Sequence, residues 1–247
     1  MKSVLYALLV FLVAGQGVGA DDKYPDTSSE PLRTRCDTVV NDSNDAIELL
    51  RIKFDAVVKN PNDPNEVLKT KWDSVVSILQ KKDIDQAVKE KVVDKIVSPI
   101  FDFPLMAKLT LGRKHWSELT EPQRENFTRL FVERLKKSYR DKILLYRDEK
   151  VILKPAVHKK NTIHIPMVLV SDNKEITMLY KLHKMDESRN VKVDEKPMAR
   201  VKERWKIYDL EIQGVSILLT YRSQFEEILR TGTVKDLLSQ LEEPPTR

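Results

Sequence analysis

Few residues in this chain could perform chemistry, and three of its four histidines are the first to consider. His164 and His183 fall on one face of two neighbouring predicted strands, and His158 lies one strand earlier. Three histidines are a common zinc ligand set, but no carboxylate is fixed near them and Lys181 lies between two of them. We therefore expect an exposed polar sheet face here and no metal site.

Covalent and nucleotide-dependent chemistry have no better support. Cys36 is the single cysteine, which excludes an intramolecular disulfide and a Cys-x-x-Cys redox pair. The sequence has no G-x-S-x-G, H-E-x-x-H or Walker motif and no glycine-rich dinucleotide turn. An isomerase or hydrolase on a cone-like α+β fold would need a buried acid–base pair, and none can be named. We expect no enzymatic activity and no cofactor.

The first twenty residues have the layout of a cleavable export signal. Lys2 precedes an apolar run of ten at positions 4–13, and small residues then lead to Ala20. Ten apolar residues are too few to span a bilayer. We expect cleavage after Ala20 and a periplasmic mature protein. The expected divisions are a signal peptide (1–20), a flexible leader (21–43), a globular domain (44–241) and a tail (242–247).

The charge pattern argues against a nucleic-acid partner. The formal net charge is +5 and the isoelectric point is near 9.0, but basic and acidic residues are interspersed along the chain. Export would also remove the protein from nucleic acid. Attraction to anionic lipid headgroups, with transient contact to a membrane surface, and attraction to an acidic partner are two uses of such a surface. A role in solubility alone is the third.

Apolar spacing of three and four predicts an all-helical first half. The segment 101–116 is rich in large apolar groups, with Pro104 suited to a first helical turn and Gly112 to a C-terminal cap. Thr120 and Gln123 then form a capping box that opens the longest helix. The expected helices before and after this segment are 45–58, 64–79, 83–97 and 121–146.

After residue 146 the period changes to two, which predicts strands. A short strand at 151–153 precedes a hairpin of 162–171 and 175–184 around Asp172-Asn173. In that hairpin opposing residue numbers sum to 345, and a register slip of one would move every apolar side chain to the other face. Pro166 implies an edge strand or a bulge. The apolar pairs are Ile163 with Leu182, Ile165 with Tyr180, Met167 with Met178, and Leu169 with Ile176.

The remainder completes an α+β fold. Residues 185–204 are rich in charge and predict a solvated excursion, and 205–212 forms the last strand. Ser216 opens a helix that points Leu218, Leu219 and Phe225 inward and ends at Gly232, and a short helix follows to about residue 241. The expected architecture is an all-helical N-terminal half packed on a curved antiparallel sheet of about four strands, with a C-terminal helix.

Two blocks of sequence resemble one known family. The first contains Phe-Asp-Phe-Pro-Leu-Met-Ala at 101–107 and Leu-Gly-Arg at 111–113. The second contains Trp-Lys-Ile-Tyr-Asp-Leu at 205–210, Gly-Val-Ser-Ile at 214–217 and Tyr-Arg-Ser-Gln-Phe at 221–225. Order, spacing and residue types resemble the MlaC-type periplasmic phospholipid-binding proteins, also called the toluene-tolerance family, over about residues 84–241. The chain departs from the family in its long leader, in the 185–204 excursion and at Thr220, where the family tends to have Asn.

The resemblance implies a function and a site. Members of the family hold acyl chains in a deep apolar pocket between sheet and helices, with the headgroup near solvent. They pass lipid between an outer-membrane lipoprotein–porin complex and an inner-membrane ABC transporter that carries a ring of MCE domains. Arg222 would either brace the helix–sheet junction, which we favour, or meet a phosphate. The expected lipid-contacting residues are Phe103, Met106, Phe127, Phe131, Tyr139, Ile165, Met167, Met178, Tyr180 and Tyr208.

The residues by themselves fit a solid core as well as a pocket, since the same side chains can build either. Burial is worth about 0.8 kcal/mol per methylene, so one sixteen-carbon chain represents roughly 12 kcal/mol and needs an enclosed site. The alternative is a periplasmic interaction module with a filled core, which would dock on a partner through its charged excursion and basic face.

Overall fold

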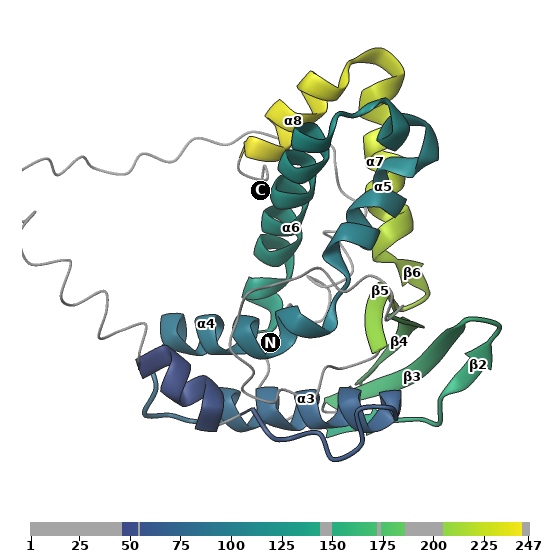
Figure 1. Ribbon diagram of the computed structural model, residues 1–247. Helices are drawn as coiled ribbons and strands as arrows, with labels where there is room; N and C mark the ends of the chain where they lie inside the picture. Colours follow the sequence, from purple (N-terminus) through teal and green to yellow (C-terminus); the bar gives the residue numbers. More distant parts are fainter. Residues whose placement is uncertain (1–45, 54, 144–149, 172–173, 186–204, 244–247) are drawn as a thin grey trace, which may run out of the picture.

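The computed structural model describes residues 46–53, 55–143, 150–171, 174–185 and 205–243. Figure 1 shows one sheet and two groups of helices. α3 (Pro64–Leu79) and α4 (Gln86–Val97) lie side by side next to the sheet. The second group consists of α5 (Phe103–Glu118), α6 (Glu121–Ile143), α7 (Ile217–Thr231) and α8 (Val234–Glu242). The predicted α+β class is confirmed.

Local sequence sets the helix ends. The carboxylates of Asp63, Asp85 and Asp102 accept backbone N–H groups in the first turns of α3, α4 and α5, which satisfies donors that a helix start leaves open. A short 3₁₀ turn, η1 (Ser98–Ile100), links α4 to α5. Gly112 interrupts α5 with a φ of 78° and a ψ of 163°, a conformation that is almost confined to glycine. Among the described helices, none has the length and apolarity needed to cross a bilayer.

The first predicted helix is shorter than the sequence pattern indicates. Residues 46–53 are helical, Phe54 lies outside the described residues, and 55–63 are irregular. The backbone N–H of Ala56 donates to Ser74 Oγ at 3.1 Å, and Lys71 donates to Asp55 at 2.9 Å. Both partners belong to α3, so tertiary contacts hold this stretch where apolar spacing predicts another turn of helix.

The sheet is antiparallel and has the hairpin register that the sequence predicts. β3 (Thr162–Ser171) pairs with β4 (Lys174–Lys184), and all four predicted apolar pairs lie opposite one another. The strand order is β1-β3-β4-β5-β6, with β2 also pairing β3. The short β2 and β6 bring the count to six where we expected about four. The other bounds are β1 (Lys150–Leu153), β2 (Val157–Lys159), β5 (Trp205–Ile212) and β6 (Val215–Ser216).

Pro166 does not lie on an edge strand, and the hairpin of β3 with β4 is regular. The expected bulge is present on the other side of β3, where residues 154–156, between β1 and β2, lie opposite only residues 165–166. Pro166 pairs with Leu179 of β4, and on its other side its carbonyl accepts the N–H of Lys154 at 2.8 Å. A strand residue turns its nitrogen and carbonyl to the same side. The proline nitrogen therefore faces the break between β1 and β2, where no ladder donor is needed.

The end of the chain follows the prediction with one exception. Ser216 caps α7 by accepting the N–H of Leu219, and Gly232 follows its last turn. The side chain of Leu219 does not point inward as expected, since the residue is 62% exposed. The predicted turn at 172–173 lies outside the described residues. So do residues 186–204 of the predicted charged excursion.

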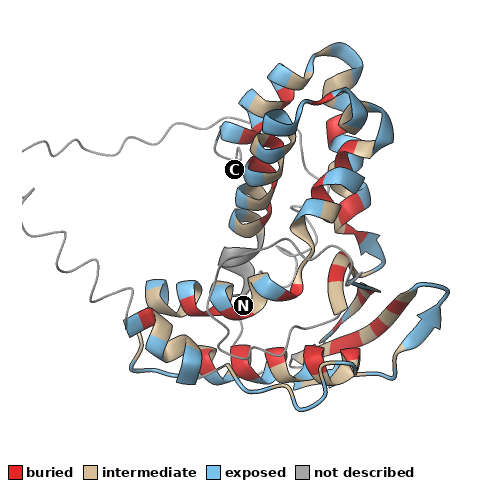
Figure 2. Ribbon diagram, in the orientation of Figure 1, coloured by how far each residue is buried: buried red, intermediate tan, exposed pale blue. Residues whose placement is uncertain are grey.

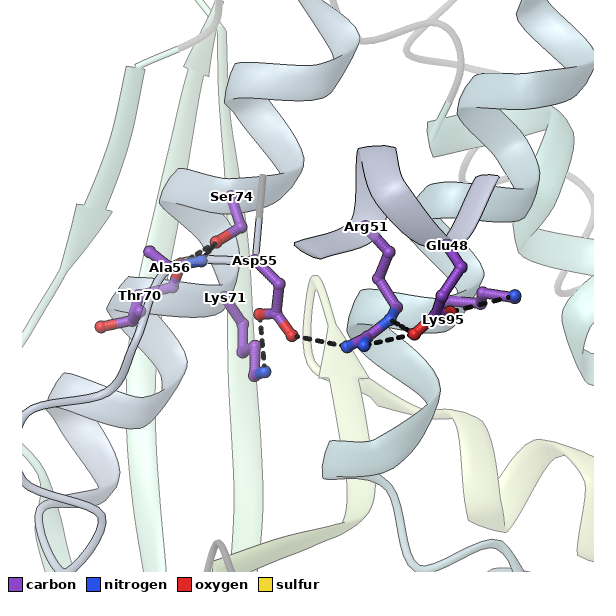
Figure 3. Close-up of polar contacts among 8 residues, drawn as sticks. All are labelled: Glu48, Arg51, Asp55, Ala56, Thr70, Lys71, Ser74 and Lys95. Carbon is purple, nitrogen blue, oxygen red and sulfur yellow. Dashed lines mark hydrogen bonds and ion pairs between the residues drawn. The ribbon is translucent and has the colours of Figure 1, made fainter. Parts of the chain in front are cut away.

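A chain of charges fastens the 46–56 segment to the first helix group (Figure 3). Arg51 donates from Nε to Glu48 at 2.9 Å and from Nη1 to Asp55 at 3.5 Å. Asp55 also accepts Lys71 of α3, and Glu48 accepts Lys95 of α4 at 3.2 Å. The segment thus spans both helices through side chains, while Ile47 is buried between them.

The ion pairs of Glu48 are sensitive to acid, because the pKa of this residue is lowered in the folded protein. The hydrogen bond from Arg51 lowers that pKa from 4.5 to about 2, against the opposing effect of burial. A lowered folded-state pKa stabilises the fold above pH 4.5, and the contribution is lost as the pH falls towards 2. We expect the wild type to have a higher urea-unfolding midpoint than Glu48→Gln at pH values above 4.5. This difference should shrink as the pH falls from 4.5 towards 2. Glu133→Gln, at an exposed ion pair on α6, is the control, and an advantage that does not change with pH would contradict the assignment.

Candidate functional site

Two apolar clusters face the centre of the molecule. The helical cluster is built from α5, α6, α7 and α8, and the sheet cluster joins one face of β3, β4 and β5 to α3. Figure 2 shows the buried positions along the strands and along the facing sides of the helices. Phe101 and Ile217 pack against both clusters. These two residues therefore mark where the clusters adjoin.

Aromatic rings dominate the helical cluster. Phe127 and Phe131 of α6 have no exposed surface, and their rings lie 6.3 Å apart. Phe225 of α7 meets Phe127 edge-on at 5.6 Å, and Tyr221 meets Phe131 at 5.4 Å. Such geometry adds to the stabilisation that area burial gives. Phe127 and Phe131, which are two of the predicted lipid contacts, are therefore enclosed by neighbouring rings.

The sheet cluster is formed by the inward face of the hairpin. Ile165 and Met167 are fully buried, and Tyr180 is nearly so. Trp72 of α3 donates from Nε1 to the Tyr180 hydroxyl at 3.1 Å. Burial raises the pKa of Tyr180, so this hydroxyl stays neutral. α3 is thereby tied to the centre of the sheet.

The ten predicted lipid-contacting residues are divided between these clusters. Met106, Phe127 and Phe131 belong to the helical cluster, and Phe103 packs against it half-buried. In the sheet cluster the members are Ile165, Met167 and Tyr180, with Met178 half-buried beside them. Tyr208 lies outside both clusters, with its ring 6.0 Å from that of His183. Tyr139 is in α6, and its side chain is outside the described part of the chain.

A buried carboxylate joins the sheet to the second helix group. Asp209 of β5 is 3% exposed, and its carboxylate accepts Ser216 Oγ at 2.9 Å and the N–H of Leu218 at 3.2 Å. Lys181 of β4 donates to it at 3.0 Å. Burial alone would lower the pKa of Lys181, but its hydrogen bonds to Glu211 and Asp209 raise it. The Lys181 ammonium therefore keeps its charge in this half-buried position.

Asp102 joins the start of α5 to two strands, through its backbone to β5 and through its carboxylate to β4. The N–H of Asp102 donates to the carbonyl of Ile207, and its carboxylate accepts His183 Nε2 at 2.8 Å and the N–H of Leu105 at 3.0 Å. Burial opposes ionisation of Asp102, but the bonds from His183 and Leu105 together lower its pKa. β5 therefore holds the first turns of both α5 and α7.

The histidines do not assemble into a site. In the register of β2 with β3, Val157 pairs with His164, so His158 points to the opposite face. Among the described residues, no group of three His, Cys, Asp or Glu side chains could hold a metal ion. The polar face is also less exposed than predicted, since both His164 and His183 are half-buried. Burial lowers the pKa of His164.

Arg222 makes a different contact from the two that were considered. Its Nε donates to Glu226 on the same helix at 2.8 Å, and its side chain is 48% exposed. The guanidinium lies against Gly112 of α5, where a side-chain carbon would stand 3.7 Å from Arg222 Nη2. It therefore braces α7 against the kink in α5, at a distance from the helix–sheet junction made by Asp209.

Asp102 and Asp209 lie in the two sequence blocks that resemble the family, but the sequence pattern predicts no role for either. The partner of Asp102 is distant, since His183 lies 81 positions further along the chain. Ser216 was expected only as a helix start. In the sequence, the one indication that Asp209 contacts the cap residue Ser216 is the short spacing between Tyr-Asp at 208–209 and Gly-Val-Ser at 214–216.

We predict that Asp209→Ala lowers the free energy of unfolding by about 3 kcal/mol, because it leaves Lys181 without its buried partner and removes an acceptor at the start of α7. Glu211→Ala removes the more exposed partner of the same lysine and should cost less than about 1 kcal/mol. Urea unfolding of both variants checks this. Equal losses would mean that the junction does not depend on the buried carboxylate.

Comparison with known proteins agrees with this architecture. A solved structure of a phospholipid-binding protein from Ralstonia solanacearum, in complex with a phospholipid, has a TM-score of 0.60 and 22% sequence identity to this chain. The match covers 73% of this chain and 95% of the other, and at that identity it establishes the fold. Residues 69–243 match the family described as "MlaC protein". The match covers well over half of the chain, and the chain belongs to the MlaC family.

Proposed function

We propose that this protein is a periplasmic, non-enzymatic carrier that binds the acyl chains of phospholipid between its sheet and its helices. The family match over residues 69–243 carries the proposal. The relative from Ralstonia solanacearum, which shares the fold, was solved with a phospholipid. In this proposal residues 1–20 are a signal peptide removed after Ala20, 21–43 form a leader, 44–241 form the carrier and 242–247 are a tail.

The transport role forms the second part of the proposal. The carrier would pass lipid between an outer-membrane lipoprotein–porin complex and an inner-membrane ABC transporter with a ring of MCE domains. Family membership supports these partners. A carrier without a nucleotide site would take its direction of transport from them.

Burial separates the predicted contact residues into two kinds. Phe127, Phe131 and Met167 have no exposed surface and are enclosed by neighbouring side chains. Phe103 and Met178 are half-buried at the margins of the two clusters. Accessible apolar surface next to a packed wall is what an acyl chain needs, and methionine adapts well to a flexible ligand. We therefore infer that the tail touches Phe103 and Met178 first.

Phe103 also lies beside a fixed positive charge. Its ring stacks on Phe101 with centroids 5.5 Å apart, and Lys136 Nζ of α6 lies 5.6 Å from the centroid of the Phe103 ring. Lys136 is held by Asp94 of α4 at 2.9 Å. Three helices thus converge on this margin. An apolar ring below an ammonium suits the junction between a lipid tail and its phosphate.

The direct test is organic extraction of the purified protein followed by mass spectrometry. We expect co-purified phospholipid, because a site that competes with a bilayer for an acyl chain releases it slowly. The final wash buffer serves as the control. A protein that yields no phospholipid and takes none up from liposomes would exclude the carrier and favour an interaction module with a filled core.

A matched pair of substitutions tests the site. Met178 and Leu179 are adjacent and half-buried on β4, but they point to opposite faces of the sheet. We expect Met178→Trp to reduce co-purified phospholipid at least about tenfold, since the indole occupies space that the tail needs. Leu179→Trp should leave the lipid content unchanged. If Met178→Trp retains its lipid, or if both variants lose lipid equally, the sheet cluster does not line the site.

A further inference from the structure

Two exposed leucines lie on neighbouring helices of the second group. Leu109 of α5 is 39% exposed and Leu219 of α7 is 62% exposed. Both helices begin beside β5, and Arg222 of α7 lies against Gly112 of α5. The helices therefore run in the same direction, as Figure 1 shows. Each leucine lies about one turn before this contact, so the two flank the same strip of surface.

Basic residues without acidic neighbours surround these leucines. Lys108, Arg113 and Lys114 are exposed, and none of the three forms an ion pair with another described residue. Residues 103–117 contain no Asp or Glu, and neither do residues 212–225. The flanking acids are engaged, because Glu118 contacts His115 and Glu226 accepts Arg222. The surface is therefore positive without local compensation.

Several exposed basic residues outside this surface are paired instead, while the exposed lysines that form no ion pair with another described residue, such as Lys82, Lys91 and Lys235, are scattered. Arg129 pairs with Glu133, Arg230 with Glu227 and Lys69 with Asp73, each within one helical turn. Such pairs are the ordinary pattern of a solvated helix face. The strip on α5 and α7 departs from it, because three of its four cations form no ion pair with another described residue and lie beside exposed leucine, while Arg222 pairs with Glu226. We call it the basic strip: Lys108, Leu109, Arg113, Lys114, Leu219 and Arg222.

We propose that the basic strip docks the protein on the surface of an anionic phospholipid bilayer. Lysine and arginine keep their charges among phosphates while their apolar stems and the leucines enter the headgroup boundary. Each basic residue near such a surface raises partitioning roughly fivefold. An acidic protein surface would satisfy the cations, but it would need an apolar recess opposite each leucine, whereas the headgroup boundary of a bilayer accepts leucine at any position. Binding of the basic strip to a bilayer does not depend on the proposed function. Only the reason for this binding, the exchange of lipid with a membrane, rests on it.

Co-sedimentation of the purified protein with vesicles tests the proposal. We expect binding to vesicles of phosphatidylcholine mixed with phosphatidylglycerol, little binding to phosphatidylcholine alone, and weakening by salt. The triple variant Lys108→Glu, Arg113→Glu and Lys114→Glu should lower partitioning by at least about 100-fold. Leu109→Ser with Leu219→Ser should weaken binding and leave its salt dependence in place. Thermal unfolding of each variant verifies that the fold is intact.

A control variant carries the same change in net charge at scattered sites. Lys82→Glu, Lys91→Glu and Lys235→Glu alter three exposed lysines of other elements, and partitioning should stay within a factor of about three of wild type. An equal loss in this variant overturns the basic strip, and so does a wild-type protein that ignores the mixed vesicles, as it would if the strip served a protein partner. The lipid extracted from the wild-type protein is measured separately. Lipid content without vesicle binding removes only this inference, and vesicle binding without lipid content removes only the carrier.

Discussion

The carboxylate of Asp209 is the point on which the relation between the sheet and the second helix group depends. It is buried, and it binds one partner in the neighbouring strand and two at the start of α7. A buried charge tolerates little displacement, because each lost partner leaves it desolvated without compensation. α7 must therefore leave the sheet at one place, which sets Ile217 between the two apolar clusters.

β5 extends this constraint to α5. The N–H of Asp102 donates to Ile207, two residues before Asp209, so the first turns of α5 and α7 are anchored on one strand. Apolar contacts alone would allow the helices to slide, since burial is not directional. Directional hydrogen bonds at both starts fix the frame. Met178, half-buried at the margin of the sheet cluster, lies outside this frame.

Most of the fold could be predicted because its determinants are local. Helix caps lie within a few residues of the groups they satisfy, and the hairpin register follows from alternation around a short turn. Two details depend instead on contacts between distant segments. The first helix stops early because α3 binds Asp55 and Ala56, and Pro166 is tolerated because β1 ends opposite it. Neither fact has any expression in the local sequence.

The site was less predictable, because periodicity reports which side of an element is apolar and not what lies across from it. Met167 and Met178 face each other in the same alternating hairpin, yet Met167 is fully buried and Met178 is half-buried. Tyr208 leaves the alternation through the bulge opposite Lys181 and Leu182.

α5 shows how much one helix can combine. Met106 and Ala107 are buried in the helical cluster, while the next two residues, Lys108 and Leu109, face outward in the basic strip. One turn of helix thus contributes to the interior and to the proposed docking surface, and Arg222 lies against Gly112 at the kink that follows it.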